Sequence, residues 1–232
     1  RENEGDLVVP ASKINAKKIN FMAKHGRGLI CLALTQEKVK KLKLPLMSLV
    51  NKSRTQTAFT VSIEAKKGIS TGISAYDRAK TIKVAIKNTS SSKDIVSPGH
   101  VFPLVSKNGG VLVRAGHTEA SVDISKLAKL NPSAVICEVM NEDGTMARYR
   151  DLVPFSKKHN LKIAKIEDLI SYRLKNEKFV KVVSSKKINI KKFGFFDLKI
   201  FKNKLDGLEH QVITNTNFSH SKTPRVRVIS TN

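Results

Sequence analysis

The chain has 232 residues, 40% hydrophobic and 27% charged, which is long enough for one full domain and a shorter second one. Its 43 Lys and Arg against 19 Asp and Glu give a formal net charge of +24, but the lysines are spread along the whole chain and no nucleic-acid-binding motif accompanies them. No apolar run reaches the roughly 18 residues of a membrane span, and two distant cysteines exclude a disulfide scaffold. The composition indicates a soluble cytoplasmic protein without a membrane partner, and a basic nucleic-acid-binding protein stays open as an alternative.

Strands and helices are expected to alternate over the first 175 residues. Apolar runs predict strands at 6–9, 29–34, 58–63 and 134–140, the first of which is stopped by Pro10. Apolar periodicity predicts helices at 12–22, 76–87, 118–130, 152–159 and 167–174. Thr35 is expected to cap a further helix, and residues 89–98 are expected to form a polar loop. The pattern indicates an α+β domain.

The composition changes after residue 175, where lysines alternate with β-branched residues. We expect a linker at 176–190 and a β-rich module at 191–232, with strands near 195–201 and 209–214. Asp206 and Gly207 lie between these strands and predict a turn.

Three carboxylates open the chain at a spacing of two residues, Glu2, Glu4 and Asp6. An extended backbone would point all three to one face, where each adjacent pair repels by roughly 2.4 kcal/mol at ~7 Å and an effective dielectric of about 20. A hard cation such as Mg²⁺ would neutralise this cluster. A hydrated terminus is the alternative.

Two histidines follow glycines, His100 after Gly99 and His117 after Gly116. Gly116 precedes an expected helix, whose free N–H groups and dipole favour an anion. Arg114 and Thr118 flank this turn and could hold a phosphate, because the guanidinium fork matches phosphate oxygens.

Glu138 interrupts the apolar run 134–140, where an unpaired carboxylate would cost several kcal/mol. It is either functional or an outward-facing residue of an edge strand. Cys31 lies in the apolar run 29–34, where a core position is the simpler interpretation.

These motifs together resemble 3,4-dihydroxy-2-butanone 4-phosphate synthase of riboflavin biosynthesis, collinearly over residues 1 to about 175. The matching segments are RENEGD at 1–6, HGRGLICLAL at 25–34, TAFTVSIEA at 57–65, TGISAYDRAKTI at 71–82, SPGHVFPL at 97–104, RAGHTEASVD at 114–123 and CEVMNEDGTMAR at 137–148. The resemblance implies a three-layer α/β/α domain with a mixed sheet. It also implies a homodimer with sites at the interface, and a lyase that converts ribulose 5-phosphate to the butanone phosphate and formate with Mg²⁺ or Mn²⁺.

The resemblance also implies roles for individual residues. Glu2 and His117 match the metal ligands, and His100 and Glu138 match residues essential for catalysis. Glu4 and Cys31 are further residues that the resemblance places in the catalytic group. Nine residues are expected to contact the substrate: Arg1, Glu2, Asp6, Asp77, Arg114, Gly116, His117, Thr118 and Glu138.

Two departures from the family pattern are expected to matter. Family members carry a helix, a strand and an acidic loop before the arginine that is Arg1 here, so an N-terminal segment is expected to be missing and a noncatalytic fragment is an alternative. The segments 193–199 and 205–210 resemble the opening of GTP cyclohydrolase II, a module often fused to the synthase. No cysteine follows Cys137, so no zinc site is expected in this chain.

Overall fold

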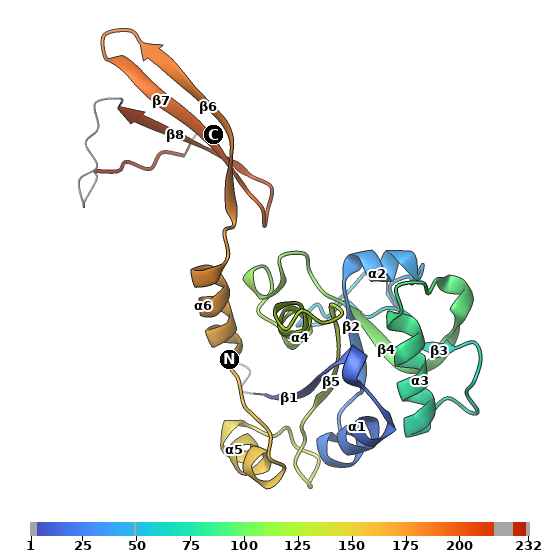
Figure 1. Ribbon diagram of the computed structural model, residues 1–232. Coiled ribbons are helices and arrows are strands. Elements are labelled where there is room, and N and C mark those ends of the chain that lie inside the picture. Colours follow the sequence, from blue (N-terminus) through green and yellow to red (C-terminus); the bar gives the residue numbers. More distant parts are fainter. Residues whose placement is uncertain (1–3, 49, 216–224, 231–232) are drawn as a thin grey trace. The chain divides into compact units, whose positions relative to one another are not determined.

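The computed structural model describes residues 4–48, 50–215 and 225–230 (Figure 1). The chain divides into two compact units, residues 1–175 and 176–232. The first contains a five-stranded mixed sheet with helices, and the second contains a three-stranded antiparallel sheet. This confirms the expected α+β class.

The five strands of the first unit lie in the order β1-β5-β2-β4-β3. Their bounds are β1 Asp6–Pro10, β2 Cys31–Leu34, β3 Ile63–Ala65, β4 Ile95–Val105 and β5 Ser133–Glu138. Only β2 and β4 pair in parallel, whereas the β1–β5, β2–β5 and β3–β4 pairs are antiparallel.

The described residues contain six α-helices: α1 Ala16–Phe21, α2 Gln36–Lys41, α3 Ala75–Ile86, α4 His117–Leu127, α5 Tyr149–Lys158 and α6 Ile166–Asn176. Figure 1 labels them along the chain. Short turns of helix cover Ala11–Lys13, Met22–Gly26, Ser92–Asp94 and Gly110–Leu112. Thr35 caps α2 as expected, because its hydroxyl accepts a hydrogen bond from the Lys38 N–H at 3.2 Å. Within the described residues, no helix is both long and apolar enough to cross a bilayer.

The alternation of side chains along the strands separates a core face from a second face of the sheet. Leu7, Leu32 and Val135 point to the core face, where they pack with α1 and α3 residues such as Ile19 and Ile82. On the second face, Cys31 and Ile136 form a smaller apolar cluster with Leu104, Phe59 and Phe102. Asp6 and Glu138 are register partners on this second face, at one end of β1 and β5. The first turn of α4 lies on that face too, because His117 reaches Asp6.

Several elements differ from the sequence-based expectations. The expected polar loop 89–98 instead ends in β4, an eleven-residue strand whose two halves pair with different neighbours, β3 before residue 102 and β2 from residue 102 on. The half that contains Pro103 also bonds residues 58–60, because the Thr60 N–H donates to the Pro103 carbonyl oxygen at 3.0 Å and the Val105 N–H donates to the Ala58 carbonyl oxygen at 2.9 Å. Pro103 thus takes part in the sheet through its carbonyl oxygen, for which no N–H is needed. The first helix begins after Asn15 rather than at Ser12, since the Asn15 side chain accepts a hydrogen bond from the Lys18 N–H at 3.0 Å.

The second unit consists of β6 Val180–Ile190, β7 Gly194–Asn203 and β8 Glu209–Asn215, in that order. The stretch 176–190, expected to be a linker, therefore contains a strand that pairs with β7 along its length. Its β-branched residues carry the strand propensity, and its lysines occupy exposed positions. Residues 204–208 make the turn from β7 to β8, in which Gly207 adopts a φ of +78°.

Candidate functional site

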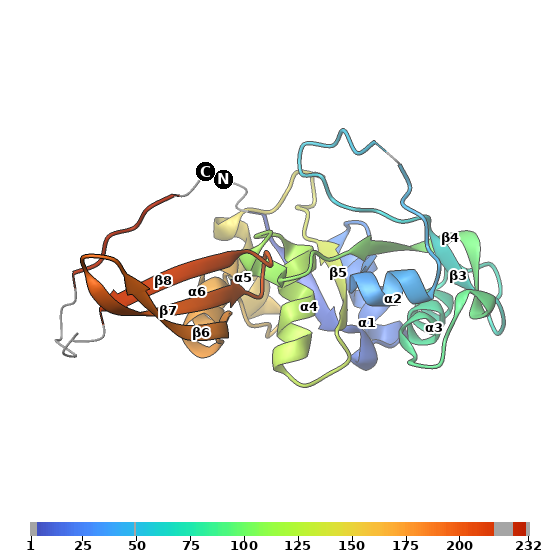
Figure 2. The ribbon, with the colours of Figure 1, turned by 90° about the horizontal axis from the view of Figure 1, so that it is seen from above.

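A pocket of about 640 Å³ opens on the second face of the sheet, beside the first turn of α4. It is bordered by β1, β2, β5, the α4 N-terminus and the segment between α2 and β3, which Figure 2 shows as a long arch. Eight residues expected to belong to the site line this pocket: Glu4, Asp6, Cys31, Arg114, Gly116, His117, Thr118 and Glu138. Arg1 and Glu2 lie outside the described residues.

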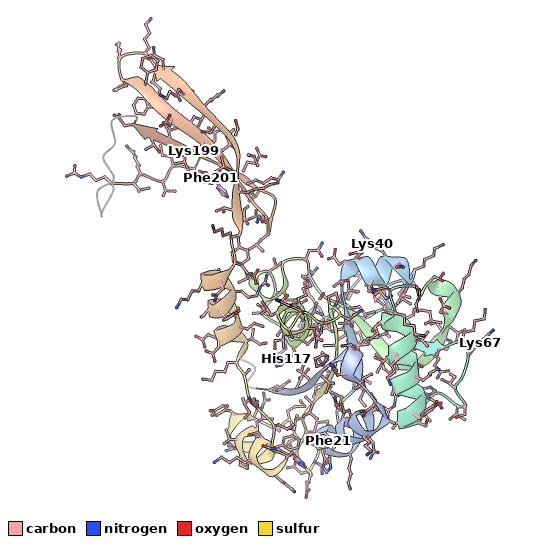
Figure 3. All side chains as sticks on the ribbon, in the orientation of Figure 1. Phe21, Lys40, Lys67, His117, Lys199 and Phe201 are labelled. Carbon is pink, nitrogen blue, oxygen red and sulfur yellow. The ribbon has the colours of Figure 1, made fainter. Side chains whose placement is uncertain are left out.

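Asp6 is the most enclosed acid of the pocket, with a side chain only 6% exposed. Its Oδ1 lies 3.5 Å from Nδ1 of His117, which Figure 3 labels near β1. Burial raises the pKa of the Asp6 carboxyl to about 6. The His117 imidazole opposes this increase, whereas the carboxylates of Glu138 and Glu4 add to it. The pocket therefore concentrates negative charge at one end.

Glu138 is held in place at the end of β5 by the turn that precedes β2. The Leu29 N–H donates a hydrogen bond to Glu138 Oε2 at 2.9 Å, which leaves Oε1 without this bond. A Cβ at Gly28 would lie 2.6 Å from both Glu138 Oε2 and the Glu138 carbonyl oxygen, so glycine is required for this close approach. The carboxylate is thus oriented by backbone groups.

Arg114 lies where the pocket meets the N-terminal end of α4. Its Nη1 pairs with the buried Glu119 at 2.6 Å, and its Nη2 donates to the Thr55 carbonyl oxygen at 3.1 Å and to the Thr57 hydroxyl at 3.2 Å. Gly116 is the N-cap of α4 and supplies no side chain, so first-turn N–H groups remain available beside Arg114. This end of the pocket is suited to an anion.

Glu4 is tied to the segment that leads into α5. Its Oε1 lies 3.2 Å from Nη1 of Arg148, and the two residues form an isolated antiparallel bridge. Gly5 packs against Leu152 of α5, where a Cβ would lie 2.5 Å from Cδ1. The start of α5 therefore fixes the described part of the acidic segment.

Cys31 borders the pocket from β2 and is only 2% exposed. Burial raises the pKa of its thiol, and the nearby Glu138 and Asp6 carboxylates raise it further. Cys31 therefore contributes a neutral thiol at neutral pH, and a thiolate is disfavoured.

His100 and Asp77 are not among the described residues that line the pocket. His100 lies in β4, where its Nδ1 bonds Glu64. Asp77 is buried in the first turn of α3 and accepts hydrogen bonds from the Ser70 hydroxyl at 2.8 Å and the Gly72 N–H at 3.1 Å. The fold thus places these two expected site residues in a second group, on either side of the segment that includes Gly72.

Sequence reasoning missed several pocket residues. Lys107 lines the pocket, and its N–H donates to Glu119 Oε1 at 3.0 Å. The sequence could have predicted the role of Glu119, because this acid lies in the first turn of α4, five residues after Arg114. No sequence pattern predicts the contacts of Thr55 and Thr57 with Arg114, because these contacts depend on how the segment between α2 and β3 folds.

The donor set of the pocket suits a hard divalent cation. Carboxylate oxygens of Glu4, Asp6 and Glu138 and the His117 imidazole border the same space. Among the described residues no three His, Cys, Asp or Glu side chains are grouped closely enough to hold a metal ion alone. Mg²⁺ commonly takes one or two carboxylates and keeps several waters, so this arrangement fits Mg²⁺.

Comparisons with known proteins agree with the motifs. The sequence profile of the 3,4-dihydroxy-2-butanone 4-phosphate synthase family matches residues 1–172. The chain is 48% identical to a protein of that name from Photobacterium phosphoreum over 228 residues, which are 98% of this chain and 62% of the relative. It is 53% identical to riboflavin biosynthesis protein RibBA of Aquifex aeolicus over 232 residues, which are 99% of this chain and 57% of the relative. The chain thus spans less than two thirds of the length of these curated relatives.

Solved structures show the same fold. A two-domain 3,4-dihydroxy-2-butanone 4-phosphate synthase from A. baumannii matches with a TM-score of 0.83 and 46% identity, covering 93% of this chain and 63% of that one. A 3,4-dihydroxy-2-butanone 4-phosphate synthase in complex with two magnesium ions matches with a TM-score of 0.72 and 38% identity, covering 76% of this chain and 87% of that one.

Proposed function

Because the chain belongs to the 3,4-dihydroxy-2-butanone 4-phosphate synthase family, we propose that it is a lyase of riboflavin biosynthesis. Its substrate is D-ribulose 5-phosphate, and its products are L-3,4-dihydroxy-2-butanone 4-phosphate and formate. The observation that carries this proposal is one pocket lined both by an oriented carboxylate, Glu138, and by Arg114 beside a helix N-terminus. A sugar phosphate has an acidic C–H group and a phosphate that match these two groups.

The reaction begins with enolisation and continues through loss of water, migration of a carbon–carbon bond and release of formate. The water lost in the second step is regained when formate leaves, so one ribulose 5-phosphate yields one butanone phosphate and one formate. No oxidant or reductant is consumed. Acid–base groups and charge stabilisation are therefore the contributions required from the protein.

The residues that line the pocket divide these tasks. Arg114, Thr118 and the first-turn N–H groups of α4 bind the phosphate and thereby fix the sugar. Glu138, oriented by the Leu29 N–H, takes and returns protons at the carbons next to the ketone. Asp6 bonds a sugar hydroxyl, and Glu4, held by Arg148, closes the acidic side of the pocket.

Glu2 and His117 would hold the divalent cation, which is either Mg²⁺ or Mn²⁺. When bound, the cation polarises carbonyl and hydroxyl oxygens, which makes the neighbouring C–H group more acidic. The carboxylates grouped around Asp6 support a cation beside them. Burial and the charges of Glu138 and Glu4 raise the pKa of Asp6, so the three carboxylates are not readily ionised together without a positive charge nearby.

A second copy of the chain supplies His100. The family resemblance implies a homodimer with sites at the interface, and within one protomer the described lining of the pocket does not include His100. A partner's His100, entering the pocket from across a two-fold axis, would complete the acid–base set.

We assign the expected GTP cyclohydrolase II-like module to residues 191–232, within the second unit, and place the protein in the cytoplasm. The similarity to the Aquifex aeolicus and A. baumannii proteins extends over this unit, because it covers 99% and 93% of the chain.

Formate release from ribulose 5-phosphate, measured with Mg²⁺ and with a chelator, tests the proposed activity. We expect release only with the metal and a loss of at least ~10²-fold in Glu138→Gln, the scale of a missing general base. Glu142→Gln is the matched control, since this acid lies nearby with a side chain 91% exposed. Metal-independent release, or full activity in Glu138→Gln, would contradict the proposal.

A further inference from the structure

His100, which is expected to be catalytic, forms an ion pair with Glu64. Neither residue is among those described as lining the pocket. Glu64 lies in β3 and His100 in β4, and Nδ1 of His100 bonds Oε1 of Glu64. The Glu64 side chain is 16% exposed, whereas that of His100 is 45% exposed. The carboxylate is therefore covered, while the imidazole keeps an accessible side and its second ring nitrogen, Nε2, is not engaged by Glu64.

Two glycines leave room for this pair. A Cβ at Gly72 would collide with Glu64 Oε1 and would lie 2.8 Å from His100 Nδ1. A Cβ at Gly99 would collide with the Ile63 carbonyl group and with the Glu64 side chain. Gly72 also has a φ of +87°, which L side chains rarely adopt. The segment 70–72 therefore packs against the pair through Gly72, which has no side chain.

Asp77 fixes that segment. Its carboxylate accepts hydrogen bonds from the Ser70 hydroxyl, the Ser70 N–H at 3.3 Å and the Gly72 N–H. The bond from the Ser70 hydroxyl is the largest cause of a lowered pKa for Asp77, so this buried carboxyl is charged at neutral pH. Asp77 thus holds the segment 70–72 in place beside Glu64 and His100. Asp77 is not among the described residues that line the pocket.

We propose that Glu64 is a positioning residue for His100, fixing the imidazole tautomer with the proton on Nδ1 and the lone pair on Nε2. A carboxylate accepts hydrogen bonds, so Nδ1 is the donor in the neutral ring and Nε2 is the free base. The carboxylate also stabilises the imidazolium that forms when Nε2 takes a proton. This inference rests on the proposed function for the role of His100 and adds to it the group that prepares His100 for proton transfer.

The first test is the tautomer of His100 in the full chain with ¹⁵N-labelled imidazole. We expect wild-type protein to carry the proton on Nδ1, Glu64→Gln to keep it there because the amide oxygen still accepts, and Glu64→Ala to lose this preference. Glu142→Gln is the control. A proton on Nε2 in the wild type, or an unchanged tautomer in Glu64→Ala, would overturn the proposal.

The second test is kinetic. In Glu64→Ala we expect kcat to fall about 10- to 100-fold, the usual cost of losing a group that orients an active imidazole, with KM unchanged because Glu64 does not touch the substrate. If Glu64 acts only through His100, the same change in a His100→Ala background has no further effect. A rise in KM alone, or an equal loss in both backgrounds, would overturn the proposal.

These outcomes separate the inference from the proposed function. Wild-type protein that releases no formate contradicts the proposed function, and the tautomer measurement then decides the assignment of Glu64 by itself. If Glu64→Ala does not fold, Glu64→Gln takes its place in the kinetic cycle, with a smaller loss of kcat expected and the same absence of an effect when His100 is alanine.

Discussion

The buried Glu119 carboxylate holds Arg114, the residue to which we assign the substrate phosphate. Glu119 is 1% exposed and accepts from both Arg114 and the Lys107 N–H. We expect Glu119→Gln to lower the free energy of unfolding by about 1–3 kcal/mol, because a charge-assisted bond is weakened in a buried place. KM for ribulose 5-phosphate should rise as Arg114 loses its orientation. Urea unfolding and steady-state kinetics measure the two effects, and a variant equal to Glu142→Gln in both would contradict this role.

Cys31 borders the same pocket with a neutral thiol, so it is not expected to act as a nucleophile. Because burial raises the pKa of this thiol, Cys31→Ala should retain kcat within about tenfold of wild type, the remaining loss coming from imperfect packing beside Ile136. Formate release by the variant measures this. A loss as large as that of Glu138→Gln would instead assign Cys31 a direct role in the chemistry.

At the scale of residues, the sequence predicted which side chains meet in one pocket better than it predicted their hydrogen-bond partners. The motifs at the chain start, before α4 and at the end of β5 bring Glu4, Asp6, His117 and Glu138 to one pocket, as the spacing and helix-start arguments require. The contact of Glu64 with His100 was not predictable, because it depends on a register shift between β3 and β4 at residues 63 and 64. Local patterns do not encode such long-range register.

At the scale of elements, the sequence predicted helices and strands with a regular apolar pattern, but it did not predict a strand that contains prolines and a glycine. The α3 helix and β5 follow their apolar patterns to within a few residues. The strand β4 was missed because Pro98, Gly99 and Pro103 disfavour a strand when read locally, although its two halves have different pairing partners. Tertiary pairing determines the conformation there.

The contact between α1 and the end of α5 is expected to weaken in acid. The His25 and His159 rings lie 4.6 Å apart, next to Phe21 and Phe155. Burial lowers the pKa of His25, and the nearby His159, Lys24, Lys158 and Arg27 lower it further, while Asp151 borders the same small pocket. Below the ordinary histidine pKa, the folded state therefore binds fewer protons than the unfolded chain, so stability is lost as the pH falls from about 7 through the lowered value.

Urea unfolding at pH 7.5 and at pH 5.5 measures this effect. We expect His25→Phe, which keeps an aromatic ring in the cluster, to lose less stability on acidification than wild-type protein does. His210→Gln is the control, because His210 is exposed in β8. An equal acid-induced loss in His25→Phe and wild type would exclude His25 as the source.

At the scale of the whole molecule, the net charge of +24 and the carboxylates of the pocket are both compatible with binding a phosphorylated sugar. A basic protein attracts a phosphorylated sugar over long distances, whereas the acidic end of the pocket acts only at short range. The high charge therefore needs no nucleic-acid partner to explain it, and the pocket carboxylates and glycine-flanked histidines have no role in a purely basic binding surface.

The separation of His100 from the pocket within one protomer leads to a prediction about the assembled enzyme. If a partner supplies His100, then His100→Ala and Glu138→Gln chains each lose most of their activity alone but complement each other when mixed. About a quarter of wild-type formate release is expected after unfolding and refolding an equal mixture, since half the dimers are mixed and one of the two sites in each is intact. Light scattering on the same samples should give the mass of two chains. A mixture no more active than the single variants would show that both residues serve a site within one protomer.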